Sequence, residues 1–131
     1  MGEPDNSREG RPEYACGIHE RDLEIRAYYR GRHQRISLLD VVYLRADQKY
    51  VSVCHPDGLL LIDGSLRTFE RDFPDLLLRI HRNTLVARSR LLGLERRPDG
   101  STCALLLDCN DTPVVSRRHL AEVRRWLRET R

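Results

Sequence analysis

Cysteine and histidine are the side chains of this chain that could bind a metal ion or act as nucleophiles. The four cysteines are Cys16, Cys54, Cys103 and Cys109, and no two of them form a CxxC pair. Cys16 and His19 give one CxxH, but no second pair stands at the spacing that a zinc site requires. The sequence therefore predicts no metal site and no cofactor, and the thiols are expected to be reduced.

Sequence motifs for catalysis are absent. The chain contains no GxSxG, no GxGxxG, no P-loop and no HExxH. Its five histidines stand singly, whereas an active site needs a nucleophile, a base and a group that stabilises developing charge. Surface or hydrogen-bonding roles are therefore favoured for the histidines. We expect neither an enzyme nor a small-molecule substrate.

Basic and amide side chains gather in three polar breaks between apolar segments. The breaks are Asp47-Gln48-Lys49, the stretch from Arg79 to Arg90, and Ser116-Arg117-Arg118-His119. Lys, Arg, Asn, Gln and His are the residues that read base edges and bind phosphates, and binding residues often lie on loops. Each break alone is better explained as a solvated turn. The three together indicate a surface for double-stranded DNA.

The charge distribution supports a polyanionic partner. The net charge is +3, but residues 1–24 carry −4 and residues 25–131 carry +7. Residues 79–97 alone carry +5 and residues 116–131 carry +4. Of the 23 basic residues 22 are arginine, which binds phosphate and guanine in a bidentate way; codon bias explains this excess equally well. Aromatic residues make up only 6% of the chain, which disfavours single-strand binding by stacking.

The terminal segment has helical periodicity. Leu120, Val123 and Leu127 repeat at helical spacing, which predicts a helix over residues 117–128 with Ser116 as its N-cap. The amides at such an N-terminus favour phosphate. The arginines that lie off the apolar face, and so remain available to an anion, are Arg117, Arg118, Arg124 and Arg125.

The length of 131 residues corresponds to one domain. Residues 1–22 are acidic and rich in Gly and Pro, which predicts a flexible leader or linker, and residues 23–131 form the expected domain. No apolar run approaches the ~20 residues of a membrane span, and no apolar signal segment is visible. We therefore expect no membrane contact and a cytoplasmic location.

The pattern of elements indicates a mainly β fold. About eight short apolar runs are separated by turns, and Leu76–Ile80 has a mixed pattern. A short helix is predicted over residues 66–72, capped by Ser65 and ended by Pro74. No long helix stands between strands, so antiparallel pairing is expected and doubly wound or barrel α/β folds are excluded.

Five segments carry a resemblance to a known family. They are ISLLDVVYLR at 36–45, DQKYV at 47–51, the helix and Phe73 at 66–73, RIHRNTLV at 79–86 and VSRRHL at 115–120. In this order they resemble the LytTR DNA-binding domain, which lies at the C-terminus of AlgR- and AgrA-type response regulators. The resemblance covers roughly 90 of the 131 residues.

The resemblance implies elongated antiparallel β-sheets with little helix, and loops that enter successive major grooves of a direct repeat. It implies base-reading roles for Lys49, Arg82 and Arg118. It is also compatible with a homodimer that binds repeated sites on DNA. With the charge pattern, it predicts sequence-specific DNA binding in a transcription regulator. The residues expected to bind phosphate or support the readers are Arg79, His81, Asn83, Arg88, Ser116, Arg117, His119, Arg124 and Arg125.

A second interpretation remains open. A LytTR-like fold could serve as a protein-interaction or sensor module whose DNA binding is weakened, or blocked by the acidic leader folding onto the basic surface. The 131 residues of the chain are not expected to include a receiver domain. A redox sensor would need a thiol of lowered pKa, and Cys54 beside His55 is the best candidate, although a buried thiol in a strand is the simpler interpretation.

Overall fold

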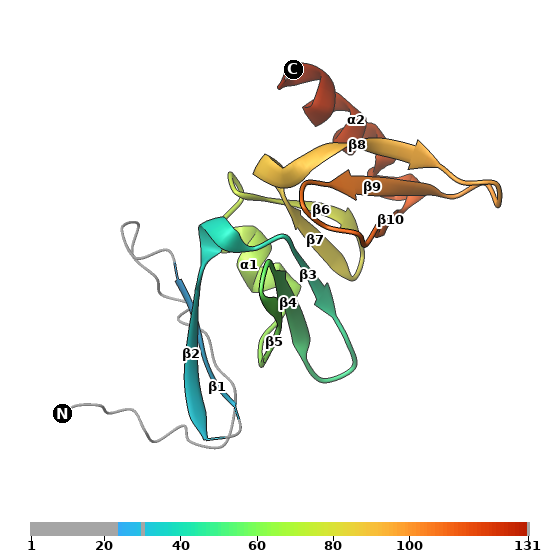
Figure 1. Cartoon of the computed structure of the whole chain (residues 1–131). Coiled ribbons are helices and arrows are strands. Elements are labelled where there is room, and N and C mark those ends of the chain that lie inside the picture. Colours follow the sequence, from blue (N-terminus) through green and yellow to red (C-terminus); the bar gives the residue numbers. More distant parts are fainter. Residues whose placement is uncertain (1–23, 30, 131) are drawn as a thin grey trace.

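The computed structural model of the chain describes residues 24–29 and 31–130 (Figure 1). The predicted leader, residues 1–22, lies outside the described residues. The described residues contain two α-helices, α1 (Leu66–Asp72) and α2 (Arg117–Glu129), and two short 3-10 turns, η3 (Leu38–Asp40) and η4 (Arg88–Arg90). The strands are β1 (Glu24–Tyr29), β2 (Arg32–Ser37), β3 (Tyr43–Ala46), β4 (Val51–His55), β5 (Gly58–Ile62), β6 (Leu77–His81), β7 (Thr84–Ala87), β8 (Leu91–Arg96), β9 (Thr102–Leu106) and β10 (Val114–Val115).

The strands form three antiparallel sheets. The β1–β2 hairpin comes first, a five-stranded sheet of order β5-β4-β3-β7-β6 follows, and a three-stranded sheet of order β10-β9-β8 lies beyond it (Figure 1). This confirms the mainly β, antiparallel fold class with a short mid-chain helix and a C-terminal helix. The described residues hold ten strands, so the expected count of about eight was too low.

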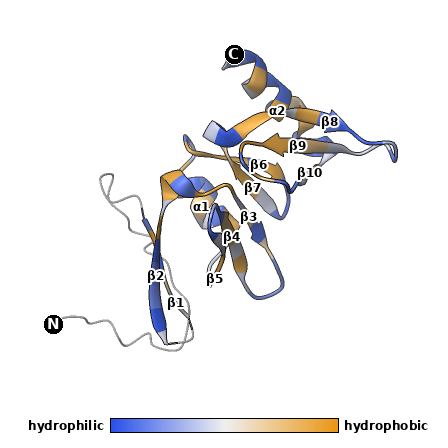
Figure 2. Ribbon diagram, viewed as in Figure 1, coloured by the Kyte–Doolittle hydropathy of each residue, from blue (hydrophilic) through white to orange (hydrophobic). Residues whose placement is uncertain are grey.

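Strand β7 and the first half of β3, in the five-stranded sheet, are buried on both faces. Leu44 of β3 and Leu85 of β7 point into one core cluster, which also holds Phe69 of α1. Their neighbours Tyr43 and Val86 point into a second cluster, against the three-stranded sheet and α2. Successive side chains of a strand face opposite ways, so a strand covered on both sides needs apolar residues at every position. Figure 2 shows this central sheet as largely hydrophobic and β2 as largely hydrophilic.

The same double burial explains the mixed pattern at Leu76–Ile80. Leu77 belongs to the first cluster and Leu78 to the second, so β6 alternates between two cores rather than between core and water. The period-2 signal of a half-exposed strand is therefore missing. The segment that the sequence left undecided is strand β6, Leu77–His81.

Both predicted helices are confirmed. Ser65 caps α1 through its Oγ, which accepts a hydrogen bond from the Thr68 N–H at 3.3 Å, and the Phe73 N–H closes the helix on the Phe69 carbonyl. Pro74 follows, as expected for a helix stop. Helix α2 buries Val123 and Leu127 and packs on β6 and β8. Among the described residues, no helix combines the length and apolar character needed to span a membrane.

Core truncation in β3 should destabilise the domain strongly. Leu44 is fully buried between β4 and β7, and Leu44→Ala leaves a cavity, so we expect a loss of about 2–5 kcal/mol in the free energy of unfolding, measured by urea denaturation. Leu59 of β5 is 63% exposed, and Leu59→Ala should change it by less than about 0.5 kcal/mol. Equal effects of the two variants would contradict the assigned core.

Candidate nucleic-acid interface

Two backbone hydrogen bonds bring parts of the three polar breaks close together. The Ala46 N–H donates to the Asn83 carbonyl at 2.9 Å, which sets the β3–β4 loop beside the β6–β7 turn. The Ser116 N–H donates to the Ile80 carbonyl at 2.9 Å, which sets the start of α2 beside the end of β6. We use the name loop surface for residues 47–50 and 81–83, which are loops, together with residues 116–119, the N-cap and first turn of α2. The two loops lie right of centre in Figure 1, below the β8–β9 hairpin.

The three residues predicted to read bases are exposed on this surface. Lys49 lies in the β3–β4 loop, which is closed by the Asp47 N–H donating to the Tyr50 carbonyl at 2.7 Å. Arg82 lies at the tip of the β6–β7 turn, and Arg118 lies in the first turn of α2. Exposed cationic side chains on two loops and on the first turn of α2 can reach a polyanion without breaking contacts in the core.

Arg79 is placed as an internal brace. Its Nε and Nη2 donate to Glu70 Oε1 at 3.2 and 2.9 Å, and its Nη1 donates to the Arg82 carbonyl at 2.6 Å. The side chain is only 17% exposed. Arg79 therefore ties α1 to the turn that presents Arg82, and its donors are directed at protein acceptors.

Glu70 was not predicted as part of the site. It is the acidic partner of Arg79 and stands in α1, nine residues earlier in the chain. The helix period placed Glu70 beside the buried Phe69, but no local pattern pairs a helix residue with a residue of the following strand. Only the packing of α1 on β6 reveals the contact.

His81 and Asn83 stabilise the turn from within. The His81 Nδ1 accepts a hydrogen bond from the Asn83 N–H at 3.3 Å. The Asn83 Oδ1 accepts from the Thr84 hydroxyl at 2.9 Å. Both side chains are half-buried, so they hold the conformation of the Arg82 turn.

Ser116 is the N-cap residue of α2, but its side chain makes no capping hydrogen bond to a helix amide. Its Oγ lies 2.7 Å from the His119 Nδ1 instead. The pKa of His119 is lowered by burial and by the nearby charge of Arg79, so the ring is neutral at neutral pH. The first amides of α2, flanked by exposed Arg117 and Arg118, are the part of this surface best suited to a phosphate.

Arg124 and Arg125 lie farther along α2. Both are exposed. Arg125 lies opposite the buried face of Val123 and Leu127, whereas Arg124 flanks that face beside Leu127 and Leu94. They place further positive charge along α2, beyond the loop surface. The arrangement suits contact with a charged backbone.

Arg88 is not brought to the loop surface. It begins η4, after the end of β7 that lies away from the β6–β7 turn. Its Nε donates to the Pro74 carbonyl at 3.0 Å, and its guanidinium lies 5.7 Å from the ring centroid of Trp126. These contacts give Arg88 a packing role between α1 and α2.

Comparison with known proteins identifies relatives of this chain. Residues 31–128 match the family described as the LytTr DNA-binding domain. The chain is 41% identical over 106 residues to the positive alginate biosynthesis regulatory protein of Pseudomonas aeruginosa, covering 80% of this chain and 43% of that protein. The chain therefore spans less than half of that relative's length.

A solved structure shows the same fold. It is a LytTr DNA-binding domain of a methyl-accepting/DNA response regulator from Bacillus cereus, with a TM-score of 0.69 and 20% sequence identity. The match covers 79% of this chain and 95% of that one. At this identity the likeness concerns the fold alone, and it agrees with the antiparallel architecture described above.

Acidification should destabilise the domain through His119. The pKa of His119 in the folded protein lies below its unfolded value of about 6.5. Near and below that pH the imidazole therefore binds more protons in the unfolded chain than in the folded one. The free energy of unfolding consequently decreases as the pH falls below about 6.5. We expect the free energy of unfolding to fall more steeply between about pH 7 and 5 for the native chain than for His119→Gln. Identical pH profiles from urea denaturation would contradict this role.

Proposed function

The chain belongs to the family of LytTr DNA-binding domains, and from this we propose that it is a sequence-specific double-stranded DNA-binding module of a transcription regulator. The family is one of regulatory DNA-binding domains rather than of enzymes. The observation that carries the proposal is the loop surface. There Lys49 and Arg82 stand exposed on two loops and Arg118 on the first turn of α2, and backbone hydrogen bonds join the three segments.

The proposal assigns base reading to the exposed loop tips. Arginine and lysine donate to the O6 and N7 of guanine in the major groove. Lys49, Arg82 and Arg118 are exposed on the loop surface, and we assign them to base edges. We propose that these loops enter successive major grooves of a direct repeat, and that two copies of the chain can occupy such repeats.

Phosphate contact is assigned to the surrounding cations. Arg117 and the first amides of α2 would bind the backbone beside the Arg118 contact, with Ser116 at the helix start. Arg124 and Arg125 would bind a more distant phosphate. Arg79 and the side chains of His81, Asn83 and His119 would act by holding the loops, because their polar atoms face protein partners. Arg88 is left out of the interface.

The relatives support a place in gene regulation. The relative from Pseudomonas aeruginosa is named a regulatory protein, and the solved domain comes from a response regulator. We propose that residues 23–131 form the output module of a regulator of this kind, in the cytoplasm, where its DNA lies.

Two classes of arginine variant should separate base reading from phosphate binding. On a duplex selected from a random pool, Arg118→Ala should weaken binding by about 5- to 150-fold and relax discrimination at one base pair. Arg124→Ala should weaken binding to selected and random duplexes alike. Fluorescence anisotropy at fixed salt measures both.

Arg35 of β2 offers a matched control. It is an exposed arginine on the β1–β2 hairpin, outside the loop surface, so Arg35→Ala removes the same charge without removing a proposed contact. The affinity of the Arg35→Ala variant for the selected duplex should stay within about twofold of that of the native chain. Equal losses from Arg118→Ala on selected and random DNA would contradict the base-reading assignment.

The affinity of the chain for DNA should also fall steeply as the salt concentration rises. Each phosphate neutralised contributes about −0.9 to the slope of log affinity against log salt concentration. We expect Arg124→Ala to reduce the steepness of this slope by about one, and Arg35→Ala to leave it unchanged. A slope near zero for the native chain would contradict binding through the phosphate backbone.

A further inference from the structure

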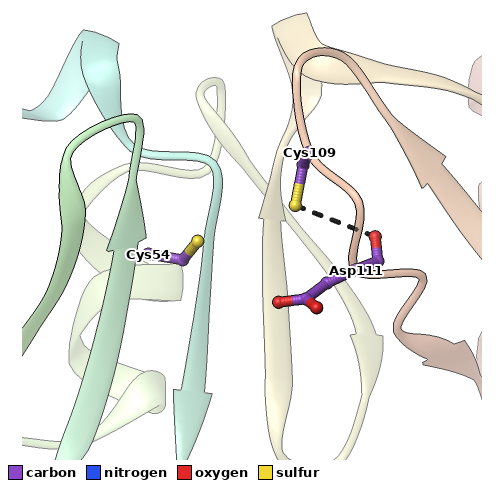
Figure 3. A group of neighbouring side chains, drawn as sticks. All are labelled: Cys54, Cys109 and Asp111. Carbon is purple, nitrogen blue, oxygen red and sulfur yellow. Dashed lines mark hydrogen bonds between the residues drawn. The ribbon is translucent and has the colours of Figure 1, made fainter.

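Two thiols and a carboxylate meet between the two larger sheets. Cys54 stands in β4 of the five-stranded sheet, whereas Cys109 and Asp111 stand in the segment that joins β9 to β10 (Figure 3). The ligand atoms of the three residues, two sulfurs and one carboxylate oxygen, all lie within 4.8 Å of one another. Local spacing could not reveal this group, because the two cysteines are 55 residues apart in the chain.

The surroundings hold these side chains in place. The Tyr43 hydroxyl donates to Asp111 Oδ2 at 2.6 Å, which orients the carboxylate and leaves Oδ1 available. The Cys109 thiol lies 3.8 Å from the Asp111 carbonyl and donates weakly to it. Cys54 and Cys109 are half-buried against the second core cluster, and Asp111 is exposed, so an ion from solvent can reach the group.

This group is separate from the loop surface. Cys54 pairs with Tyr43, at the start of β3, whereas the β3–β4 loop follows Ala46 at the other end of the pair. The three side chains therefore lie toward the opposite end of β3 and β4 from Lys49. The DNA-binding role proposed above does not use them.

We propose that Cys54, Cys109 and Asp111 form a binding site for a thiophilic divalent cation, and that this cation is Zn²⁺. Two thiolates and one carboxylate match the ligands that zinc accepts, and three protein ligands leave a fourth position for water. Thiolate ligands select against Mg²⁺ and Ca²⁺, which prefer oxygen. Tyr43 would act as the outer partner that orients Asp111.

The three ligand atoms need to move only slightly closer together to bind zinc. Zinc bonds of about 2.3 Å to sulfur place two thiolates about 3.8 Å apart in a tetrahedron. The present separations reach up to 4.8 Å, so a movement of about 1 Å, within the reach of side-chain rotation in the β9–β10 segment, completes the site.

Binding is an exchange of protons for metal with no change of oxidation state. The S–H bonds of Cys54 and Cys109 break, their protons leave to water, and two sulfur–zinc bonds form. Burial and the neighbouring Cys109 raise the pKa of the Cys54 thiol. Because each thiol must lose its proton to bind, affinity for the cation should fall as the pH falls.

The consequence of binding is a cross-link between sheets. Cys54 belongs to the five-stranded sheet, and the segment carrying Cys109 and Asp111 leads through β10 to the start of α2. A bound cation would fix this segment against β4. It would stabilise the folded state, since the unfolded chain does not hold the three ligands together.

Cobalt(II) provides a spectroscopic probe for the reduced full chain. We expect one equivalent to bind, with a near-ultraviolet thiolate-to-cobalt charge-transfer band and the strong visible bands of tetrahedral coordination, and zinc to displace it. At free zinc about 100-fold above its Kd, the Tm should rise by about 10 °C. Both responses should disappear in Cys54→Ser and Cys109→Ser.

Two further variants keep the test decisive. Asp111→Asn changes an exposed side chain and should fold normally, yet weaken cobalt binding at least tenfold. Cys103→Ala removes the third described cysteine, which is buried in β9 away from this group, and should keep the charge-transfer band. Circular dichroism of the metal-free variants checks that each is folded.

Three outcomes would overturn the proposal. One is the absence of the charge-transfer band in the native chain. Another is a band that survives Cys54→Ser and Cys109→Ser in folded protein. The third is a Cys54–Cys109 disulfide that forms in air while the reduced chain takes up neither cobalt nor zinc, because the pair would then be a redox pair and not a metal site.

Discussion

The pairing of β7 with both β3 and β6 is the constraint on which the surface of this domain depends. It places the β6–β7 turn beside the β3–β4 loop, where the Ala46 N–H meets the Asn83 carbonyl. Near the end of β6, the Ile80 carbonyl then accepts a hydrogen bond from the Ser116 N–H. Buried backbone groups must find partners, so these bonds fix the relative positions of three segments that are distant in sequence.

The polar residues of this edge divide between two tasks. Arg82 and Arg118 are exposed, whereas Arg79 is directed at Glu70 and at the Arg82 carbonyl. A partly buried arginine left without its acceptors is costly, and an arginine with acceptors on two elements holds them rigidly. The long side chains that face solvent therefore project from a backbone that is already ordered, which lowers the entropic cost of binding.

Much of the fold could be predicted from the sequence because its signals are local. Ser65 and Pro74 bound α1, and the spacing of Leu120, Val123 and Leu127 predicts α2. The first polar break is a loop, whereas the second contains strand β7 and the third continues into α2. Strand β6 could not be assigned, because both of its faces are buried and the usual alternation is absent. Arg88 falls within the second break in sequence, but β7 carries it away from the turn that presents Arg82.

The parts of the site that depend on tertiary contacts were beyond sequence reasoning. Glu70 meets Arg79 only because α1 packs on β6. Cys54 meets Cys109 only because the β9–β10 segment returns across the five-stranded sheet, and no motif marks that return. Separations of this length are set by sheet order, which hydrophobic periodicity does not encode.

The most direct measurement is a map of backbone amide chemical shifts by NMR as a selected duplex is added to the chain. The account predicts that the largest shifts fall together in residues 47–50, 81–83 and 116–119, and that the β1–β2 hairpin changes little. Shifts confined to one of these segments, or concentrated on the β1–β2 hairpin, would contradict a surface built from three segments acting together.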